Sequence, residues 1–287
     1  MIEDSIIPAI LGRPTFASLV VSNSIAFADL ESTFPAASYS GRYAVVVING
    51  MNVLMQSNGA SWGPANGQCT LEISGVGYGI MPSGTVSAGA SGHFVSGTAF
   101  PYTYSSGLWM YIVSAGTTPA LAAGFYWCVF SNTTTCTIYT NGPGSAAYNF
   151  TVGAATTGST SEITARSVTI PAGLMGESGQ LVCDSLTSLS ATATSRSLRT
   201  RLGGSQTCVM GTAVGTTTSY SGRATTQNAS ALVQYSNPVF TGSTSTSTLT
   251  RTAIDTTAET TYSLTLQMGA ATDYIINHSF RLDLFKV

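Results

Sequence analysis

Aromatic side chains are the residues of this sequence best suited to bind a ligand. Sugars stack their apolar faces on exposed aromatic rings, while Asn, Thr and Ser side chains bond the sugar hydroxyls. Aromatic residues occur here in islands between glycines, with many Thr and Ser nearby. The candidate contacts for a carbohydrate or protein ligand are Tyr102, Tyr104, Trp109, Tyr111, Trp127 and Tyr220. The alternative interpretation places the same rings in the core or in a subunit interface.

Groups that could catalyse a reaction are few and scattered. A serine or cysteine nucleophile needs a neighbouring base, and the chain has only two histidines, His93 and His278, each within strand-like sequence. No Gly-x-Ser-x-Gly motif is present. Sugar hydrolysis would need two carboxylates roughly 5–10 Å apart, and the acidic residues beyond the N-terminal region form no local pair. The sequence therefore predicts no catalytic site.

The sequence also predicts no metal ion and no cofactor. The five cysteines are widely spaced, no Cys-x-x-Cys pair occurs, and neither histidine has a cysteine at zinc-site spacing. Residues 75–79 (GVGYG) match neither a P-loop nor a dinucleotide fingerprint, so we expect a flexible or bulged turn there. We expect buried, reduced thiols, with a Cys128–Cys136 disulfide across a hairpin as the alternative.

Composition argues against nucleic-acid and membrane partners. Of the 287 residues, 44% are hydrophobic and only 8% charged, and the net charge is −2. Nucleic-acid binding needs clustered Lys and Arg, yet Lys286 is the only lysine and the one local arginine cluster is Arg196, Arg199 and Arg201. The acidic N-terminus lacks the basic region of a secretory signal, and no apolar run approaches the roughly 18–20 residues that span a bilayer. We expect cytoplasmic synthesis and no membrane insertion.

Strand signals dominate the chain and predict an all-β protein. In the N-terminal part, the apolar residues 43–48 (YAVVVI) are followed by Asn49-Gly50 and a second apolar run, and Asn58-Gly59 leads to Trp62. Asn-Gly between apolar runs is typical of a two-residue hairpin turn. We therefore expect a small β meander within residues 26–75, with residues 24–30 as the best candidate for a short helix.

The middle of the chain, residues 76–150, is rich in glycine and aromatic residues and predicts a second β region. Tyr102 and Tyr104 alternate along the sequence, as do Trp109 and Tyr111. Successive side chains of a strand point to opposite faces, so we expect each pair to lie on one face of a sheet.

The last part of the chain predicts a separate sandwich. Residues 151–162 (TVGAATTGSTSE) are small and polar, which favours a linker. From residue 163 to 287, short strands recur between Gly and Asn, and Tyr262, Leu264 and Leu266 alternate with polar residues. This spacing predicts a C-terminal antiparallel β-sandwich, jelly-roll-like in type.

Two stretches resemble modules that recur in virion proteins of tailed bacteriophages. The first spans residues 27–64 and the second residues 168–204, which is similar to a β-sandwich module often found at the C-terminal end of such proteins. The second module often has an aromatic where this chain has Leu186 or Leu189. A weaker similarity is the run 123–127 (AGFYW). The matching positions are Pro35-Ala36-Ala37, Gly41-Arg42, Ser57-Asn58-Gly59 and Trp62, then Ile170-Pro171-Ala172-Gly173, Met175-Gly176, Gly179-x-Leu181 and Leu202-Gly203-Gly204.

The resemblance implies a location in the virion and assembly with itself as a homotrimer, and it does not identify the part of the particle. Our main hypothesis is a non-enzymatic structural protein of tail-fibre or tail-appendage type that contributes to host attachment, with a host-cell glycan or protein as the receptor. Residues 1–25, apolar at Ile6, Ile7, Ile10 and Leu11, are expected to attach the chain to other virion proteins. Two alternatives stay open: a capsid decoration or head-fibre protein, and a polysaccharide-cleaving tail enzyme.

Overall fold

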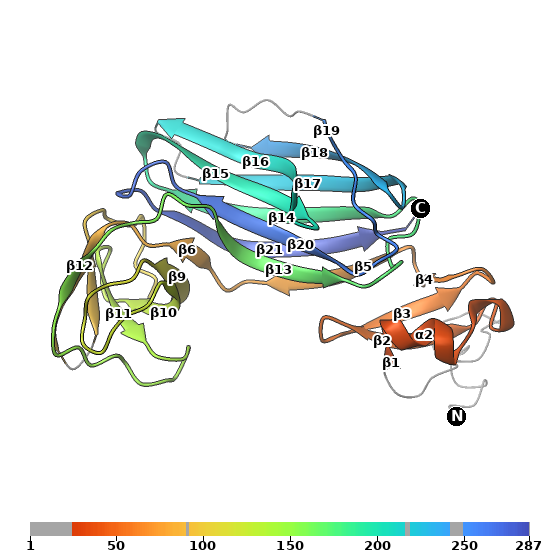
Figure 1. Ribbon diagram of the computed structural model, residues 1–287, viewed down its shortest axis with the longest axis horizontal. Coiled ribbons are helices and arrows are strands. Elements are labelled where there is room, and N and C mark those ends of the chain that lie inside the picture. The colour runs from red at the N-terminus through yellow and green to blue at the C-terminus, as the bar shows by residue number, and fades with distance from the viewer. Residues whose placement is uncertain (1–24, 90–91, 216–218, 242–248, 287) are drawn as a thin grey trace.

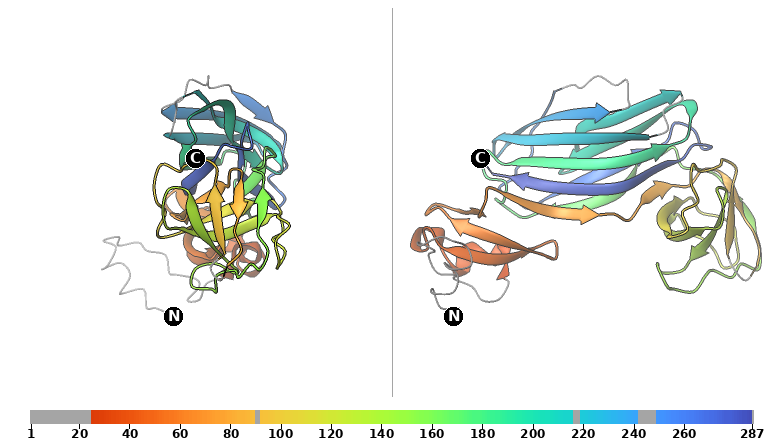
Figure 2. Two further views of the ribbon diagram at one scale, coloured as in Figure 1. Left: turned by 90° about the vertical axis from the view of Figure 1, so that its left-hand side faces the viewer. Right: turned by 180° about the vertical axis from the view of Figure 1, so that it is seen from behind.

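The computed structural model describes residues 25–89, 92–215, 219–241 and 249–286, which are almost entirely β-structure (Figure 1). The molecule has three units in space: a small N-terminal sheet at one end, a two-sheet sandwich in the centre, and a glycine- and aromatic-rich unit at the other end (Figures 1 and 2). In the sequence, most of the sandwich follows the glycine- and aromatic-rich unit. The all-β prediction with a C-terminal antiparallel sandwich is confirmed. The expected attachment segment, residues 1–25, lies outside the described residues except for Ile25.

The N-terminal sheet has the strand order β1-β2-β3-β4. The predicted hairpin turn is confirmed: Asn49 and Gly50 have φ of 50° and 77°, the left-handed backbone that this turn type requires. Alternating residues of the second and third strands are buried beneath a short helix. The strands are β1 (Ile25–Ala26), β2 (Tyr43–Ile48), β3 (Met51–Ser57) and β4 (Trp62–Pro64).

The short helix begins later than its sequence pattern indicates. The sequence predicts a helix at residues 24–30, whereas the structure has helix α2 at Phe27–Thr33. The 3-10 helix η1 (Ala36–Ser38) follows it. Ile25 and Ala26 pair in parallel with β2, so their backbone is extended and the helix starts after them. Leu30 faces the sheet and is fully buried.

Two strands carry the chain from the first unit to the third along one edge of the sandwich. β5 (Gln68–Ser74) and β6 (Tyr78–Ile80) both pair with β21 (Ile275–Phe285), one at each end of it. Part of the predicted N-terminal module therefore belongs to the sandwich sheet. The turn expected at residues 75–79 is wrong in its second half, because β6 pairs with strands on both sides. A strand of three residues with a glycine in the middle is too short to show alternation in the sequence.

The third unit, which lies at the end of the molecule opposite the N-terminal sheet (Figure 1), extends the sheet that contains β21. Its strands are ordered β12-β7-β8-β11-β10-β9-β6. Its own core contains Phe94, Met110, Phe130 and Phe150. The strands are β7 (Gly84–Val86), β8 (His93–Ser96), β9 (Leu108–Ile112), β10 (Gly124–Phe130), β11 (Thr135–Tyr139) and β12 (Ala154–Thr156).

Two expectations for this unit differ from the structure. The predicted linker at residues 151–162 contains β12, which pairs with β7; small polar residues suit an edge strand as well as a linker. Tyr102 and Tyr104 lie in the loop before β9 and not in a strand, so their alternation places them on no common sheet face. Trp109 and Tyr111 do share a face of β9.

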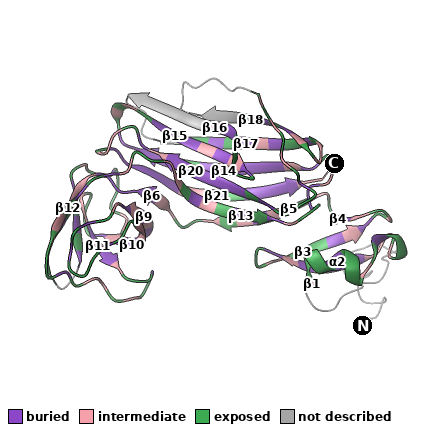
Figure 3. Cartoon of the chain, in the orientation of Figure 1, coloured by how far each residue is buried: buried purple, intermediate pink, exposed green. Residues whose placement is uncertain are grey.

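The sandwich consists of two antiparallel sheets, ordered β13-β20-β15-β16 and β21-β14-β17-β18-β19. Apolar residues from both sheets, such as Leu264 and Leu282, meet in one buried core (Figure 3). The strands are β13 (Ile163–Ile170), β14 (Gln180–Leu189), β15 (Thr192–Leu202), β16 (Ser205–Gly215), β17 (Ser219–Ser230), β18 (Val233–Thr241), β19 (Thr250–Thr252) and β20 (Thr260–Gln267).

All five cysteines are free thiols, as predicted, and the alternative Cys128–Cys136 disulfide is not formed. Burial raises the pKa of Cys69 to about 12 and that of Cys208 to about 11. Thiols in such surroundings hold their protons at neutral pH and react poorly.

The only lysine of the chain ties the end of β21 to the N-terminal sheet. The Lys286 backbone N–H donates to the Gly67 carbonyl at 2.6 Å, and its Nζ donates to the Trp62 carbonyl at 3.2 Å. Asn49 adds a second tie, because its side-chain amide donates to the carbonyls of Leu71 and Thr169 at 3.2 and 3.0 Å. The first unit is thus held against the sandwich by polar contacts as well as by the shared core.

Truncation of Leu282 tests the shared core. Leu282 is fully buried in the middle of β21, so Leu282→Ala should lower the free energy of unfolding by about 2–5 kcal/mol. Leu232→Ala is the control, because Leu232 is 58% exposed and its truncation should change that free energy by less than ~0.5 kcal/mol. Urea unfolding measures both, and equal effects of the two truncations would contradict this packing.

Candidate functional site

Four aromatic residues stand in one row across four adjacent strands of the third unit. Tyr78 of β6 lies opposite Trp109 of β9, Trp109 opposite Trp127 of β10, and Trp127 opposite Tyr139 of β11. The next row pairs Tyr111 with Phe125. We call this surface the aromatic face and define it as Tyr78, Trp109, Tyr111, Phe125, Trp127 and Tyr139.

The rings of the aromatic face pack mainly edge to face. Trp109 and Trp127 have centroids 5.6 Å apart at 71°, and Tyr111 and Phe125 are 5.4 Å apart at 73°. Tyr78 and Trp109 are the exception, stacked at 6.2 Å and 30°. These geometries are favourable for aromatic pairs, so the rings hold one another in place. The opposite side of the same strands faces the core of the unit.

Neighbouring groups cover part of the aromatic face. The guanidinium of Arg166 lies 4.0 Å above the Tyr78 ring centre, a cation–π contact. Gly107 lies so close to the Trp127 ring that a Cβ there would come within 2.5 Å of it, and its φ of +81° also favours glycine. Trp127 is therefore only 7% exposed, whereas Trp109, which Gly142 approaches closely, and Tyr111 stay half-exposed.

The predicted contact residues do not form one site. Trp109, Tyr111 and Trp127 come together on the aromatic face, but Trp127 is buried there. Tyr102 is 66% exposed in its loop and contacts Tyr104 edge to face. The side chain of Tyr220 lies outside the described part of the structure.

Tyr104 is held in a structural contact. Its ring stacks on His278 at 5.7 Å and 25°, and its hydroxyl is buried. Burial raises the pKa of this hydroxyl above its ordinary value. Tyr104 therefore joins the third unit to the sandwich and offers no open ring face for a sugar.

Sequence reasoning missed Tyr78, Phe125 and Tyr139 as members of the aromatic face. Phe125 stands two residues before Trp127 in β10, so period-2 alternation could have placed them on one face. Tyr78 had no comparable local signal, because its strand is three residues long and its partner Trp109 is distant in sequence.

One serine–histidine contact lies beside Tyr104. Ser188 Oγ is 2.6 Å from His278 Nε2, which is within reach for proton transfer. Burial lowers the pKa of His278 and favours its neutral form. Among the described residues, no carboxylate forms an ion pair or hydrogen bond with His278. Ser188 is 5% exposed, so a substrate would have little access to it.

The carboxylates of the sandwich are held by local partners. Asp184 accepts two hydrogen bonds from Arg223, at 2.7 and 2.9 Å, and Asp283 accepts one from Arg281 at 2.6 Å. The fully buried Asp273 accepts hydrogen bonds from three hydroxyls, those of Ser190, Thr192 and Thr194. These contacts serve the fold.

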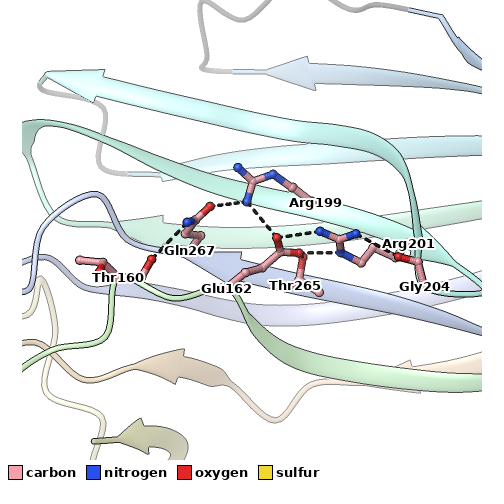
Figure 4. A network of polar contacts seen from close by, with 7 residues as sticks. All are labelled: Thr160, Glu162, Arg199, Arg201, Gly204, Thr265 and Gln267. Atoms are coloured by element: carbon pink, nitrogen blue, oxygen red, sulfur yellow. Dashed lines mark hydrogen bonds and ion pairs between the residues drawn. The ribbon is translucent and has the colours of Figure 1, made fainter.

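Two arginines of the cluster seen in the sequence, Arg199 and Arg201, are held by Glu162 (Figure 4). Arg201 donates from Nε and Nη2 to the two oxygens of Glu162, each at 2.7 Å, and Arg199 reaches the same carboxylate at 3.5 Å. Arg199 also donates to Gln267 at 2.6 Å. Arg196 is fully buried and donates to Thr192. This cluster therefore presents no free basic patch.

In the part of the chain that the structure describes, no group of three or more His, Cys, Asp or Glu side chains is arranged to hold a metal ion. Within the same residues, no helix is long and apolar enough to cross a bilayer. Comparison with protein-family models and with curated proteins finds no match to this chain.

The Glu162 network predicts loss of stability in acid. Hydrogen bonding from Arg201, opposed by burial and assisted by Thr265, lowers the pKa of Glu162 from 4.5 to about 2. A carboxylate with a lower pKa in the folded state contributes stability above its unfolded pKa and loses it as the pH falls. The contribution, about 2 kcal/mol, should be present above pH 4.5 and disappear towards pH 2.

Urea unfolding between pH 2.5 and 6 measures this effect. Glu162→Gln should flatten the pH dependence of the unfolding free energy in that range. Glu177→Gln, at an exposed position, is the matched control and should leave the pH dependence as in the unmodified protein. An unchanged profile for Glu162→Gln would exclude the network as its source.

Proposed function

We propose that this protein is a structural component of a tailed-phage virion, of tail-fibre or tail-tip type, that contributes to attachment to the host surface. The observation that carries the proposal is the position of the aromatic face. It lies on the unit at the opposite end of the molecule from the N-terminal unit (Figures 1 and 2). A chain anchored through residues 1–25 would hold this face away from its anchor.

The three-unit architecture supports the same proposal. The third unit joins the central sandwich through β6, which pairs with β21. The N-terminal unit joins it through β5, which also pairs with β21, and through the hydrogen bond of Lys286 to Trp62. The third unit continues the sheet of β21, and the N-terminal sheet is tied to the end of β21 by hydrogen bonds, so both connections help to keep the spacing between anchor and contact surface constant. A constant spacing is useful in a structural protein that holds a contact surface at a distance from its anchor.

The aromatic face suits a ligand with little charge. Trp109 and Tyr111 offer half-exposed rings, and the aromatic face itself consists of uncharged side chains. A host-surface glycan would stack on these rings and exchange hydrogen bonds with nearby hydroxyls. A host protein with an apolar surface is the other receptor class for the same rings.

Self-assembly belongs to the proposal. We propose that the chain works as a homo-oligomer, a trimer by resemblance to phage fibre proteins, and that residues 1–25 bind other virion proteins. The sparse charge of the sequence, 8% of residues, suits a protein that buries surface against further copies.

Locating the chain in the intact particle tests the proposal directly. Antibody labelling of purified virions, followed by a three-dimensional map of the particle, should place the protein at the tail. A position on the head would support the capsid-decoration or head-fibre alternative. Particles that lack the polypeptide would overturn the proposal.

Substitution on the aromatic face tests the attachment role. Trp109→Ala and Tyr111→Ala should each weaken binding of the purified protein to host-envelope preparations by about tenfold, because each removes a half-exposed ring. Tyr235→Ala is the control, since Tyr235 is an exposed aromatic on the sandwich. Thermal unfolding checks that the variants fold. Equal binding by all three would exclude the aromatic face as the contact surface.

A further inference from the structure

The outer face of the larger sandwich sheet exposes large apolar side chains. Ile73 of β5 is 64% exposed and Leu186 of β14 is 45% exposed. Both line an open hollow of about 690 Å³ between the strands, whose floor includes the small residues Gly222 and Ser279. The right-hand view of Figure 2 looks onto strands β5, β21, β14 and β17 of this sheet. An antiparallel sheet face that meets only water usually carries polar residues.

Charges of alternating sign cross the same face. Arg281, Asp184 and Arg223 stand in register on three neighbouring strands, and Ile73 continues the row on β5. Asp283 lies beside Arg281 and accepts its hydrogen bond at 2.6 Å. Two arginines and two aspartates leave this part of the face with no net charge. A face of this kind is electrostatically complementary to another copy of itself.

The opposite face of the sandwich differs. There Arg199 and Arg201 of β15 and Thr265 of β20 bind Glu162 in the polar network of Figure 4. None of the exposed large apolar residues in the described chain lies on β13, β15 or β20. Among the side chains that the structure describes, exposed large apolar residues therefore gather on the larger sheet of the sandwich and not on β13, β15 or β20.

We propose that a second copy of this chain packs on the outer face of the larger sheet, which we define as Ile73, Asp184, Leu186, Arg223 and Arg281. The inference rests on the self-assembly included in the proposed function and names the surface responsible for it. Leu186 and Ile73 of one copy enter the hollow of the next, and the Arg–Asp row of one copy meets charges of the opposite sign in the other. An apolar centre surrounded by polar and charged groups is typical of protein interfaces.

A charged substitution at Leu186 tests the surface in the full-length chain. The unmodified protein should sediment as an oligomer, and Leu186→Glu should raise the dissociation constant at least about tenfold. Leu232→Glu is the matched control, because Leu232 is also an exposed leucine but lies in the turn between β17 and β18. Circular dichroism and thermal unfolding of both variants show whether each is folded. Asp184→Arg, which places three arginines in one row, should weaken assembly as well.

Several outcomes would overturn the inference. A monomer at every concentration would do so, as would Leu186→Glu protein that assembles like the unmodified chain. If the unmodified protein is already a monomer and Leu186→Glu still removes its host-envelope binding, the surface would belong to a host component instead. The assembly measurements and the particle map test different claims. If the chain assembles through another face, the virion proposal still stands. If the particle lacks this chain, the interface measured in solution still stands.

Discussion

The pairing of β21 is the constraint on which the rest of the structure depends. This strand pairs with β14 along one edge and with both β5 and β6 along the other. Lys286, just after its end, holds the N-terminal sheet, and His278 within it carries the Tyr104 ring of the third unit. One strand therefore fixes the positions of all three units, although it comes last in the sequence and its partners lie far away along the chain. Such long-range pairing is entropically costly to close.

Charged groups serve almost entirely inside this architecture. The carboxylates of Glu162, Asp184 and Asp283 each bind an arginine, and Asp273 is surrounded by hydroxyls. Ion pairs of this kind add modest stability at the surface, and where they are partly buried the cost of removing the charges from water offsets part of the gain. The aromatic face is built from uncharged rings, whereas the outer face of the larger sheet carries the Asp184–Arg223 and Arg281–Asp283 pairs beside its apolar residues.

The aromatic face and the sandwich are mechanically connected. Arg166 belongs to β13 of the sandwich, yet its guanidinium covers Tyr78, the first ring of the aromatic row. Tyr78 stands on β6, which pairs with β21 on one side and with β9 on the other. The proposed contact surface is thus held by the same strands that would support assembly, and its orientation relative to the sandwich follows from their pairing.

The sequence by itself determined the features that depend on neighbouring residues. The Asn49-Gly50 turn, the alternation of Leu264 and Leu266 and the common face of Trp109 and Tyr111 follow from backbone geometry with a period of two. Only the tertiary structure decided which distant residues meet. It placed Tyr104 on His278, buried Trp127 beneath Gly107, added Tyr78 to the aromatic row and neutralised Arg201 with Glu162. The physical reason is that local periodicity orients a side chain, whereas the partner it meets depends on strand pairings between segments far apart in the chain.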